Sequence, residues 1–419
     1  MDPATFETAE QKALTDELIR RAEALVPGIR QRSREAEMLR RLPDATMKEV
    51  EEAGLIEALS PRSFGGHGLG LRALCEVART LAHGDTSTAW VVSFLMEHNW
   101  MACYFDMSAQ RRIFADKPYL LAAAPLQPGG TAERVPGGFL VTGVFRYASA
   151  VMNSDWTFAS TSVTEADGSK DQYTFLIPLR DVTVHDEWFF SGMAATGSTN
   201  VEAKDVFVPD DLAMPTSRLH SMKGIVGTEH PEGIYRYPIL PALYAMMAAM
   251  ALGCGEAAVE LYRQKLQTSA PWGLTRIDRE SARVRWLKAH QNVRLARMLY
   301  LEMMRTVIRK GEGQEDWALE ETAQVEFDRV TAAHLCKDAI RLIADGAGSS
   351  AFHLDDPIQR YLRDIDVLAN HIGMDWDLAA DRDSRWLLGL GRNATDPHAA
   401  IRTPATASTA AAQNIEAVS

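Results

Sequence analysis

The chain has 419 residues, which exceeds one ordinary domain and predicts two or three packed units around a large core. Its hydrophobic share of 46% and charged share of 24% are typical of a soluble globular protein. A net charge of -12 argues against nucleic acid or an anionic membrane as the main partner, because both bind basic surfaces.

Cysteine usage and the longest apolar run favour a soluble, cytoplasmic protein. The cysteines are widely spaced and form no CxxC or Cys/His pattern, so we expect reduced, mostly buried thiols and no metal site; they are Cys75, Cys103, Cys254 and Cys336. The first twelve residues are acidic and polar, so we expect no signal peptide. The apolar run 239–255 is too short to span a bilayer and contains Pro241, so we expect a buried bundle helix.

Three kinds of pattern follow one another along the chain. Residues 1–118 carry helical periodicity, interrupted by a glycine-rich turn at 65–70, and predict an N-terminal helical domain. Residues 119–218 predict a β domain, because they contain four short β-rich runs at 137–145, 155–163, 172–179 and 201–209. Residues 219–393 predict a C-terminal helical bundle after a polar connector, and 394–419 predict a disordered tail.

Two segments of the β-rich part suggest a flat cofactor. Residues 145–156 (FRYASAVMNSDW) and 191–209 (SGMAATGSTNVEAKDVFVP) place small residues and hydroxyls at strand ends or turns. At such places a planar ring can approach the backbone closely. This pairing favours a flavin lying against the β domain, and hence an oxidoreductase.

The order and spacing of several motifs then resemble a known family. The motifs are GDTSTAW (84–90) followed by His98, AAP (123–125), YAS (147–149), ATGS (195–198) and DPIQRYLRD (356–364) followed by His371. Together they resemble the acyl-CoA dehydrogenase superfamily, over about residues 10–391. Within it, the chain is similar to the oxygenase components of two-component, reduced-flavin-dependent monooxygenases such as p-hydroxyphenylacetate hydroxylase.

The resemblance implies a fold and an activity. The fold is mainly α with a small central β domain: an N-terminal helical domain, a β-barrel-like domain and a C-terminal four-helix bundle, assembled as a homotetramer. The activity uses reduced FMN or FAD and O2, through a C4a-hydroperoxyflavin, to hydroxylate a small aromatic substrate (phenolic, indolic or polycyclic).

The source of the reduced flavin follows from a missing motif. No GxGxxG follows a strand within a βαβ unit, and the nearest match, at 389–394, stands at the end of the last predicted helix. We therefore expect a separate NAD(P)H:flavin reductase as the partner.

The resemblance also implies cofactor contacts. Ser149 would lie beside flavin N5 and accept its N–H, which slows loss of hydrogen peroxide. Thr196, Gly197 and Ser198 would contact the polar edge of the ring, and Trp90 would pack on the flavin or substrate, or fill the core. Two alanines depart from the glycines common in the family, Ala150 and Ala195, so we expect a different local backbone there.

Two histidines are the candidate acid–base residues, because histidine titrates near neutrality. His371 follows the DPIQRYLRD motif by one or two helical turns and is the first candidate for the bundle cavity. His98 is the second, although its aromatic and methionine-rich helix also fits a plain core. Arg360 and Arg363 would bind cofactor phosphate across a subunit interface, or else form an ion-pair network within the bundle.

One position bears on the substrate. Relatives that hydroxylate phenols can carry serine at the position of Ala124, so the absence of serine here favours a bulkier, more apolar ring than hydroxyphenylacetate.

Three alternative functions stay open at this point. The hydroperoxyflavin also performs N- or S-oxygenation of heteroaromatics. An acyl-CoA dehydrogenase needs a glutamate base where we find His371, and a non-catalytic flavin carrier would bind without turnover.

Overall fold

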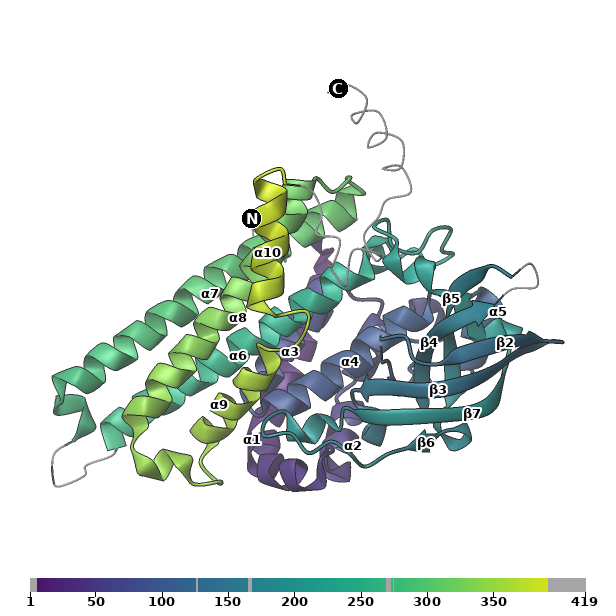
Figure 1. Ribbon diagram of the computed structural model, residues 1–419. Coiled ribbons are helices and arrows are strands. Elements are labelled where there is room, and N and C mark those ends of the chain that lie inside the picture. The colour runs from purple at the N-terminus through teal and green to yellow at the C-terminus, as the bar shows by residue number, and fades with distance from the viewer. Residues whose placement is uncertain (1–5, 126, 165–167, 269–272, 274, 391–419) are drawn as a thin grey trace, which may run out of the picture.

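The computed structural model describes residues 6–390 except 126, 165–167, 269–272 and 274. The predicted tail (394–419) and most of the 389–394 segment therefore lie outside the described residues. Figure 1 shows the long helices on one side of the molecule and the strands, with the short helix α5, on the other.

The N-terminal part is helical, as predicted. Thr8 starts the first helix: its side chain accepts the N–H of Gln11, whose side chain in turn accepts the N–H of Thr8. The helix ends where Arg40 adopts a left-handed conformation. The helices of this part are α1 (Ala9–Leu39), α2 (Asp44–Glu52), α3 (Leu71–Ala82), α4 (Thr86–Ala102) and α5 (Met107–Ile113).

The β-rich part forms one eight-stranded sheet. Its strands are β1 (Ala122–Ala123), β2 (Thr131–Val135), β3 (Gly138–Ala148), β4 (Trp156–Thr164), β5 (Lys170–Pro178), β6 (Thr183–Val184), β7 (Thr199–Pro209) and β8 (Ala213–Pro215). The order is β6-β7-β3-β2-β4-β5-β8, with β1 beside β4. The pairs β1–β4 and β2–β4 are parallel and the other pairs antiparallel. All four predicted β-rich runs are strands.

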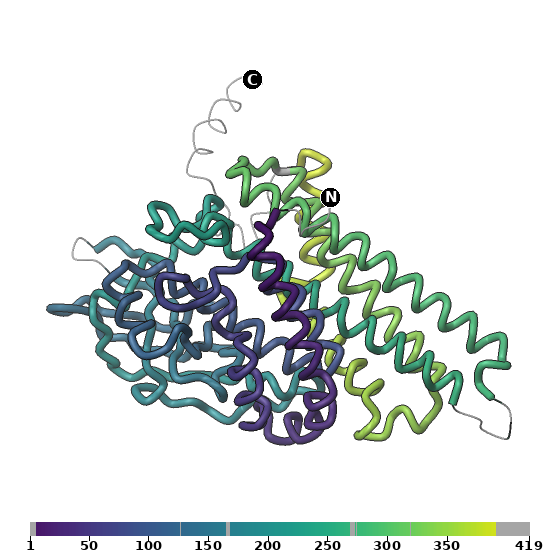
Figure 2. The backbone as a smooth tube through the Cα atoms, turned by 180° about the vertical axis from the view of Figure 1, so that it is seen from behind, coloured from purple at the N-terminus to yellow at the C-terminus, as the bar shows by residue number. Residues whose placement is uncertain are grey.

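The C-terminal part is a bundle of long helices. They are α6 (Ile239–Thr268), α7 (Glu280–Gly313), α8 (Leu319–Ala347), α9 (Pro357–Leu368) and α10 (Trp376–Leu387). Helix α6 is the one described helix long and apolar enough to cross a membrane, yet 94% of its most apolar window is buried in the fold, as predicted for a bundle helix. Seen from behind, α1 lies along the near side while α7 and α8 extend away from the sheet (Figure 2).

Helix α4 joins the two halves of the molecule. Every residue from Thr86 to Ala102 is buried, whereas a surface helix keeps one polar face in water. It lies between the sheet and the bundle (Figure 1). Residues four positions apart on α4 share one face of this buried helix, so their side chains line the same region of the interior.

The backbone is strained where β3 ends. Tyr147 and Ala150 have φ angles of 64° and 67°, in the left-handed region that residues with a Cβ rarely adopt. The β3–β7 register is irregular between Phe145 and Ala148. The Ala150 N–H donates to the carbonyl of Thr196 at 3.0 Å. Two left-handed residues thus bracket Ser149 and turn it out of the strand, and such strain gathers at functional sites.

Replacing Ala150 with glycine tests this strain. Relief of the left-handed conformation, worth about 1 kcal/mol, should offset the loss of a buried methyl, about 0.8 kcal/mol. We expect Ala150→Gly to change the free energy of unfolding by less than about 1 kcal/mol. The control Ala148→Gly, buried in the adjoining strand, should cost about 1–2 kcal/mol in the same urea titration. Equal losses would contradict the strain.

Candidate active site

A chain of hydrogen bonds connects α4 to the two turns of the sheet. The Trp90 indole N–H donates to Ser149 Oγ at 3.0 Å, and Ser149 Oγ lies 2.8 Å from Ser198 Oγ. Ser198 Oγ lies 2.8 Å from Thr196 Oγ1, and the Thr196 hydroxyl donates to the Met193 carbonyl at 2.8 Å. All four side chains are buried. The structure therefore brings together the predicted residues Trp90, Ser149, Thr196 and Ser198.

The hydrogen bonds in this series run in one donor-to-acceptor direction, from Trp90 to the Met193 carbonyl. Because the Thr196 proton goes to a carbonyl, Ser198 must donate to Thr196, and Ser149 must donate to Ser198. A hydroxyl has one proton and two lone pairs. The Ser149 oxygen already accepts from Trp90 and has one lone pair left. It can only accept from an incoming group, as the N–H of a reduced flavin requires.

Gly197 is required by its surroundings. Its φ is 52°, and a Cβ there would lie 2.7 Å from the Arg40 carbonyl oxygen and 2.9 Å from Met152 Cγ. Glycine lets the 193–198 turn press against the chain that follows α1. By contrast, Ala195 lies in a short 3-10 helix (Ala194–Thr196) and needs no left-handed angle.

An aromatic row on α4 leads from Trp90 to His98. The Trp90 and Phe94 rings lie 4.8 Å apart, Phe94 and His98 5.5 Å, and His98 and Phe158 of β4 6.0 Å between centroids. The spacing of four residues gives this row, because such positions share a helix face. The row provides an apolar, aromatic wall beside the Ser149 turn.

His98 is held neutral and has a partner that the sequence analysis missed. Its Nδ1 lies 2.6 Å from the Ala122 carbonyl oxygen and must carry the proton, and its Nε2 lies 3.5 Å from Glu97 Oε2. Burial lowers the pKa of His98 to about 4, and burial raises the pKa of Glu97 to about 8. At neutral pH both groups are uncharged. Glu97 carries no sequence signal beyond being a charged residue type in an apolar helix.

His371 reaches the same place from the bundle. Helix α9 ends at Leu368, so His371 lies in the turn before α10 and not on a helix continuing the motif. Its Nδ1 accepts the Gly373 N–H at 3.1 Å, and its ring meets the Trp90 ring edge to face at 5.4 Å. It is partly exposed. Trp90 thus contacts both Ser149 and His371.

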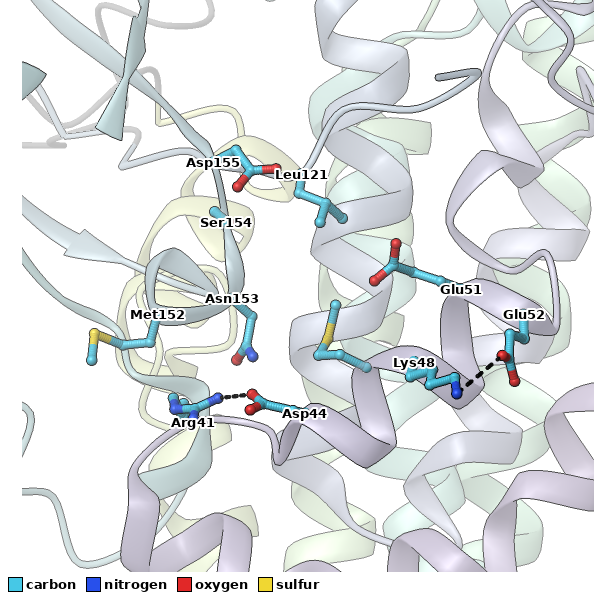
Figure 3. Close-up of a pocket in the computed structure, with 11 residues that line it drawn as sticks. Arg41, Asp44, Lys48, Glu51, Glu52, Leu121, Met152, Asn153, Ser154 and Asp155 are labelled. Atoms are coloured by element: carbon cyan, nitrogen blue, oxygen red, sulfur yellow. Dashed lines mark hydrogen bonds and ion pairs between the residues drawn. The ribbon is translucent and has the colours of Figure 1, made fainter. Parts of the chain in front are cut away.

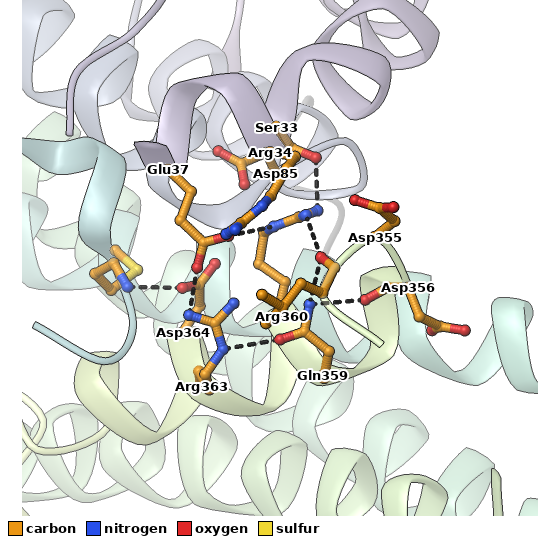
Figure 4. Close-up of polar contacts among 12 residues, drawn as sticks. Ser33, Arg34, Glu37, Asp85, Asp355, Asp356, Gln359, Arg360, Arg363 and Asp364 are labelled. Carbon is orange, nitrogen blue, oxygen red and sulfur yellow. Dashed lines mark hydrogen bonds and ion pairs between the residues drawn. The ribbon is translucent and has the colours of Figure 1, made fainter. Parts of the chain in front are cut away.

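Arg360 and Arg363 bind within the chain. The Arg360 guanidinium donates to Ser33 Oγ at 2.6 Å, and Arg363 pairs with Glu37 of α1 (Figure 4). Burial acts to raise the pKa of Glu37, but the hydrogen bonds from Arg363 and Arg34 hold it below its usual value. Of the two roles considered for these arginines, phosphate binding or a structural ion-pair network, these contacts match the ion-pair network. A role in phosphate binding stays a prediction.

A surface pocket of about 550 Å³ lies between α2 and the segment that follows the Ser149 turn, residues 152–155 (Figure 3). None of the predicted site residues lines it; its lining is Arg41, Asp44, Met47, Lys48, Glu51, Glu52, Leu121, Met152, Asn153, Ser154 and Asp155. Many of these side chains are charged, whereas pockets for aromatic ligands are mostly apolar. Within the described residues, no group of three or more His, Cys, Asp or Glu is arranged to hold a metal ion.

The neutral state of Glu97 gives a measurable pH dependence. The raised pKa means that the folded chain keeps a proton that the unfolded chain releases above about pH 4.5, so stability falls as pH rises. Relative to wild type, Glu97→Gln should gain roughly 1.4 kcal/mol of unfolding free energy per pH unit between about pH 5 and about pH 8. Urea titrations measure it. Glu10→Gln on the exposed side of α1 is the control, and a Glu97→Gln curve parallel to wild type would contradict the assignment.

Comparison with known proteins agrees with this geometry. The family model "Acyl-CoA dehydrogenase, N-terminal domain" matches residues 8–110, and "Acyl-CoA dehydrogenase, C-terminal domain" matches 245–376. A pigment production hydroxylase of Rhodococcus sp. (strain ATCC 21145) is 31% identical over 89% of this chain and 97% of its own. The flavin-dependent monooxygenase oxygenase subunit HsaA of Mycobacterium tuberculosis is 30% identical over 84% of this chain and 90% of its own.

A solved structure, XiaF from Streptomyces sp. in complex with FADH2 and glycerol, superimposes with a TM-score of 0.86 at 28% identity, over 91% of this chain and 98% of that one. Hydroxylases and monooxygenase subunits that match over nearly their whole length favour oxygenation over acyl-CoA dehydrogenation. The predicted fold is confirmed: an N-terminal helical part, a central sheet and a C-terminal helical part. The chain belongs to the oxygenase subunits of flavin-dependent monooxygenases, built on the acyl-CoA dehydrogenase fold, and is an oxidoreductase.

Proposed function

We propose that this chain binds reduced FMN or FAD supplied by a separate NAD(P)H:flavin reductase and uses O2 to hydroxylate an aromatic substrate. The observation that carries the proposal is the Ser149 hydroxyl. It donates its proton to Ser198, accepts the Trp90 N–H, and has one lone pair left to accept a further hydrogen bond. The relative's name "oxygenase subunit" supports a separate reductase, and the XiaF complex with FADH2 supports a reduced flavin.

The residues of the Ser149 turn fit a flavin. Trp90, Ser149, Thr196, Gly197 and Ser198 would hold the ring: the Ser149 oxygen can accept a ring N–H, and the turn at 196–198 would offer backbone and hydroxyl groups to its polar edge. When bound, reduced flavin supplies the two electrons that activate O2. Burial of the hydroxyl chain excludes water, which favours transfer of oxygen to substrate over its loss as peroxide.

The aromatic row supports a ring-shaped, apolar substrate. Phe94, His98 and Phe158 would hold it beside the flavin, and Ala124 adds no polar partner. We assign the role of base to His371, which is partly exposed and can exchange protons with solvent. His98, held neutral with its proton on Nδ1, would orient the substrate through Nε2.

The α7 surface supports a homo-oligomer, with a homotetramer as the assembly we propose. Four apolar side chains on this helix are 40% to 57% exposed: Val284, Leu287, Leu295 and Met298. At 3.6 residues per turn they lie within about 80° of one another and form a stripe that the exposed Gln291 interrupts. Such a stripe is typical of a covered helix face.

The four cysteines are buried free thiols, which supports a cytoplasmic location.

Removing the Ser149 hydroxyl tests the function. We expect Ser149→Ala to release hydrogen peroxide about tenfold faster after anaerobic mixing with reduced FMN or FAD and then with O2, because one hydrogen bond to the reacting ring is lost. With 2-naphthol as the probe, the fraction of O2 that appears in product should fall. Ser154→Ala, which loses only a bond to the Ala150 carbonyl, is the control. An unchanged peroxide yield would contradict the role of Ser149.

Charge on the α7 stripe tests the assembly. The double variant Leu287→Glu with Met298→Glu should lower the molar mass in light scattering, because buried, unpaired carboxylates oppose association. The variant Ala24→Glu with Gln31→Glu adds the same two carboxylates to exposed positions of α1 and serves as a control. A wild-type mass of 46.3 kDa would contradict a homo-oligomer outright.

A further inference from the structure

Two buried carboxyl groups lie where the three site-bearing segments meet. Asp85 caps α4, which carries Trp90: its Oδ2 accepts the N–H and the hydroxyl of Thr88, each at 2.8 Å. Asp364 lies on α9, which leads to His371, and its Oδ1 accepts the N–H of Met193 at 2.6 Å (Figure 4). Both side chains are 2% exposed. The pair thus connects α4, α9 and the 193–198 turn.

The two groups cannot both be charged at low cost. Burial, then the charge of Asp85, raises the pKa of Asp364, and burial also raises the pKa of Asp85. Other ionisable groups act on the pair from every neighbouring element: Glu37 of α1, Cys254 of α6, and Arg360, Tyr361 and Arg363 of α9. The arginines are already paired with Glu37. Two buried carboxyl groups whose charges oppose one another in a dry site are therefore not both ionised at low cost, and one of them keeps its proton.

The hydrogen bonds decide which carboxyl holds that proton. Asp85 accepts two donors, which stabilise its charged form, whereas Asp364 accepts only the Met193 N–H. The second oxygen of Asp364, Oδ2, has no protein partner among the described residues. The proton accordingly belongs on Asp364.

Asp364 is also the anchor of the 193–198 turn. A Cβ at Gly192 would lie 2.0 Å from the Arg363 carbonyl oxygen, so the chain before the turn rests directly on α9. Met193, with a φ of 52°, then begins the turn, and its carbonyl ends the hydroxyl chain from Ser149. Fixing the Met193 N–H therefore fixes the far end of that chain.

We propose that Asp364 is a positioning residue of the oxygenase: as an uncharged carboxyl beside the charged Asp85, it holds the 193–198 turn against Ser149, and its ionisation loosens that hold. The catalytic meaning rests on the proposed function. As pH rises and Asp364 loses its proton, a charge that burial disfavours first and Asp85 opposes second weakens the packing of α9 and the turn against α4. Loss of oxygen as peroxide should then increase on the alkaline side.

Two substitutions separate the uncharged state from the hydrogen bond. Asp364→Asn keeps an acceptor for the Met193 N–H and cannot ionise. We expect it to keep wild-type coupling at neutral pH and to lack the alkaline rise in peroxide release. Asp364→Leu removes the acceptor at similar volume and should bind reduced FMN about tenfold more weakly at every pH.

The experiment measures peroxide yield and reduced-FMN affinity against pH for wild type and both variants. The control is Asp366→Asn on the same helix, where Asp366 pairs with Arg341 at 2.8 Å; it should follow the wild-type profile. An alkaline rise that persists in Asp364→Asn, or a Leu variant that binds flavin as wild type does, would overturn the positioning role.

A second measurement needs no flavin. Because folded Asp364 keeps its proton, the stability of the wild type should fall more steeply with rising pH than that of Asp364→Asn. If the unfolding free energies of the two proteins change with pH in parallel, Asp364 does not keep its proton, whatever the function of the protein. Wild-type protein that binds no reduced flavin at any pH, while these curves diverge, would instead count against the proposed function.

Discussion

The hydrogen bond from the Trp90 indole to the Ser149 hydroxyl ties the helical half of the molecule to the sheet. It joins a helix buried over its whole length to a strand end that leaves the regular β conformation at two residues. The same indole ring lies against His371 from the bundle. A displacement of any one segment would therefore move a residue of the site.

Burial determines the charge state of this site. Glu97 and His98 are uncharged near neutrality because a dry environment disfavours either charge. The arginines of α9, by contrast, pair with Glu37 and donate to carbonyl groups. The side of α4 that carries Phe94 and His98 is thus aromatic and neutral, and the ion pairs of Arg360 and Arg363 lie between α9 and α1. Such an arrangement suits an oxidant that must be kept from water.

The hydroxyl chain shows why direction matters as much as distance. Four hydroxyl or indole groups within hydrogen-bonding distance have several possible proton arrangements. The Met193 carbonyl removes that freedom, because a carbonyl can only accept. Ser149 is left as an acceptor at the end of the chain nearest Trp90. The polarity of the site follows from one backbone oxygen 44 residues away in sequence.

The sequence by itself determined the order of the elements, the four main strands, the buried α6 and the residues of the Ser149 turn. These depend on local periodicity and on motifs whose residues are close in the chain. It left Arg360 and Arg363 between two roles, placed His371 on a helix that ends before it, and gave no sign of Glu97 as a partner of His98. Only the tertiary structure showed that both arginines contact α1, that His371 lies in a turn and that Glu97 lies near the His98 ring. The reason is physical: charge state and hydrogen-bond direction depend on burial and on neighbours from distant segments, which a linear pattern does not contain.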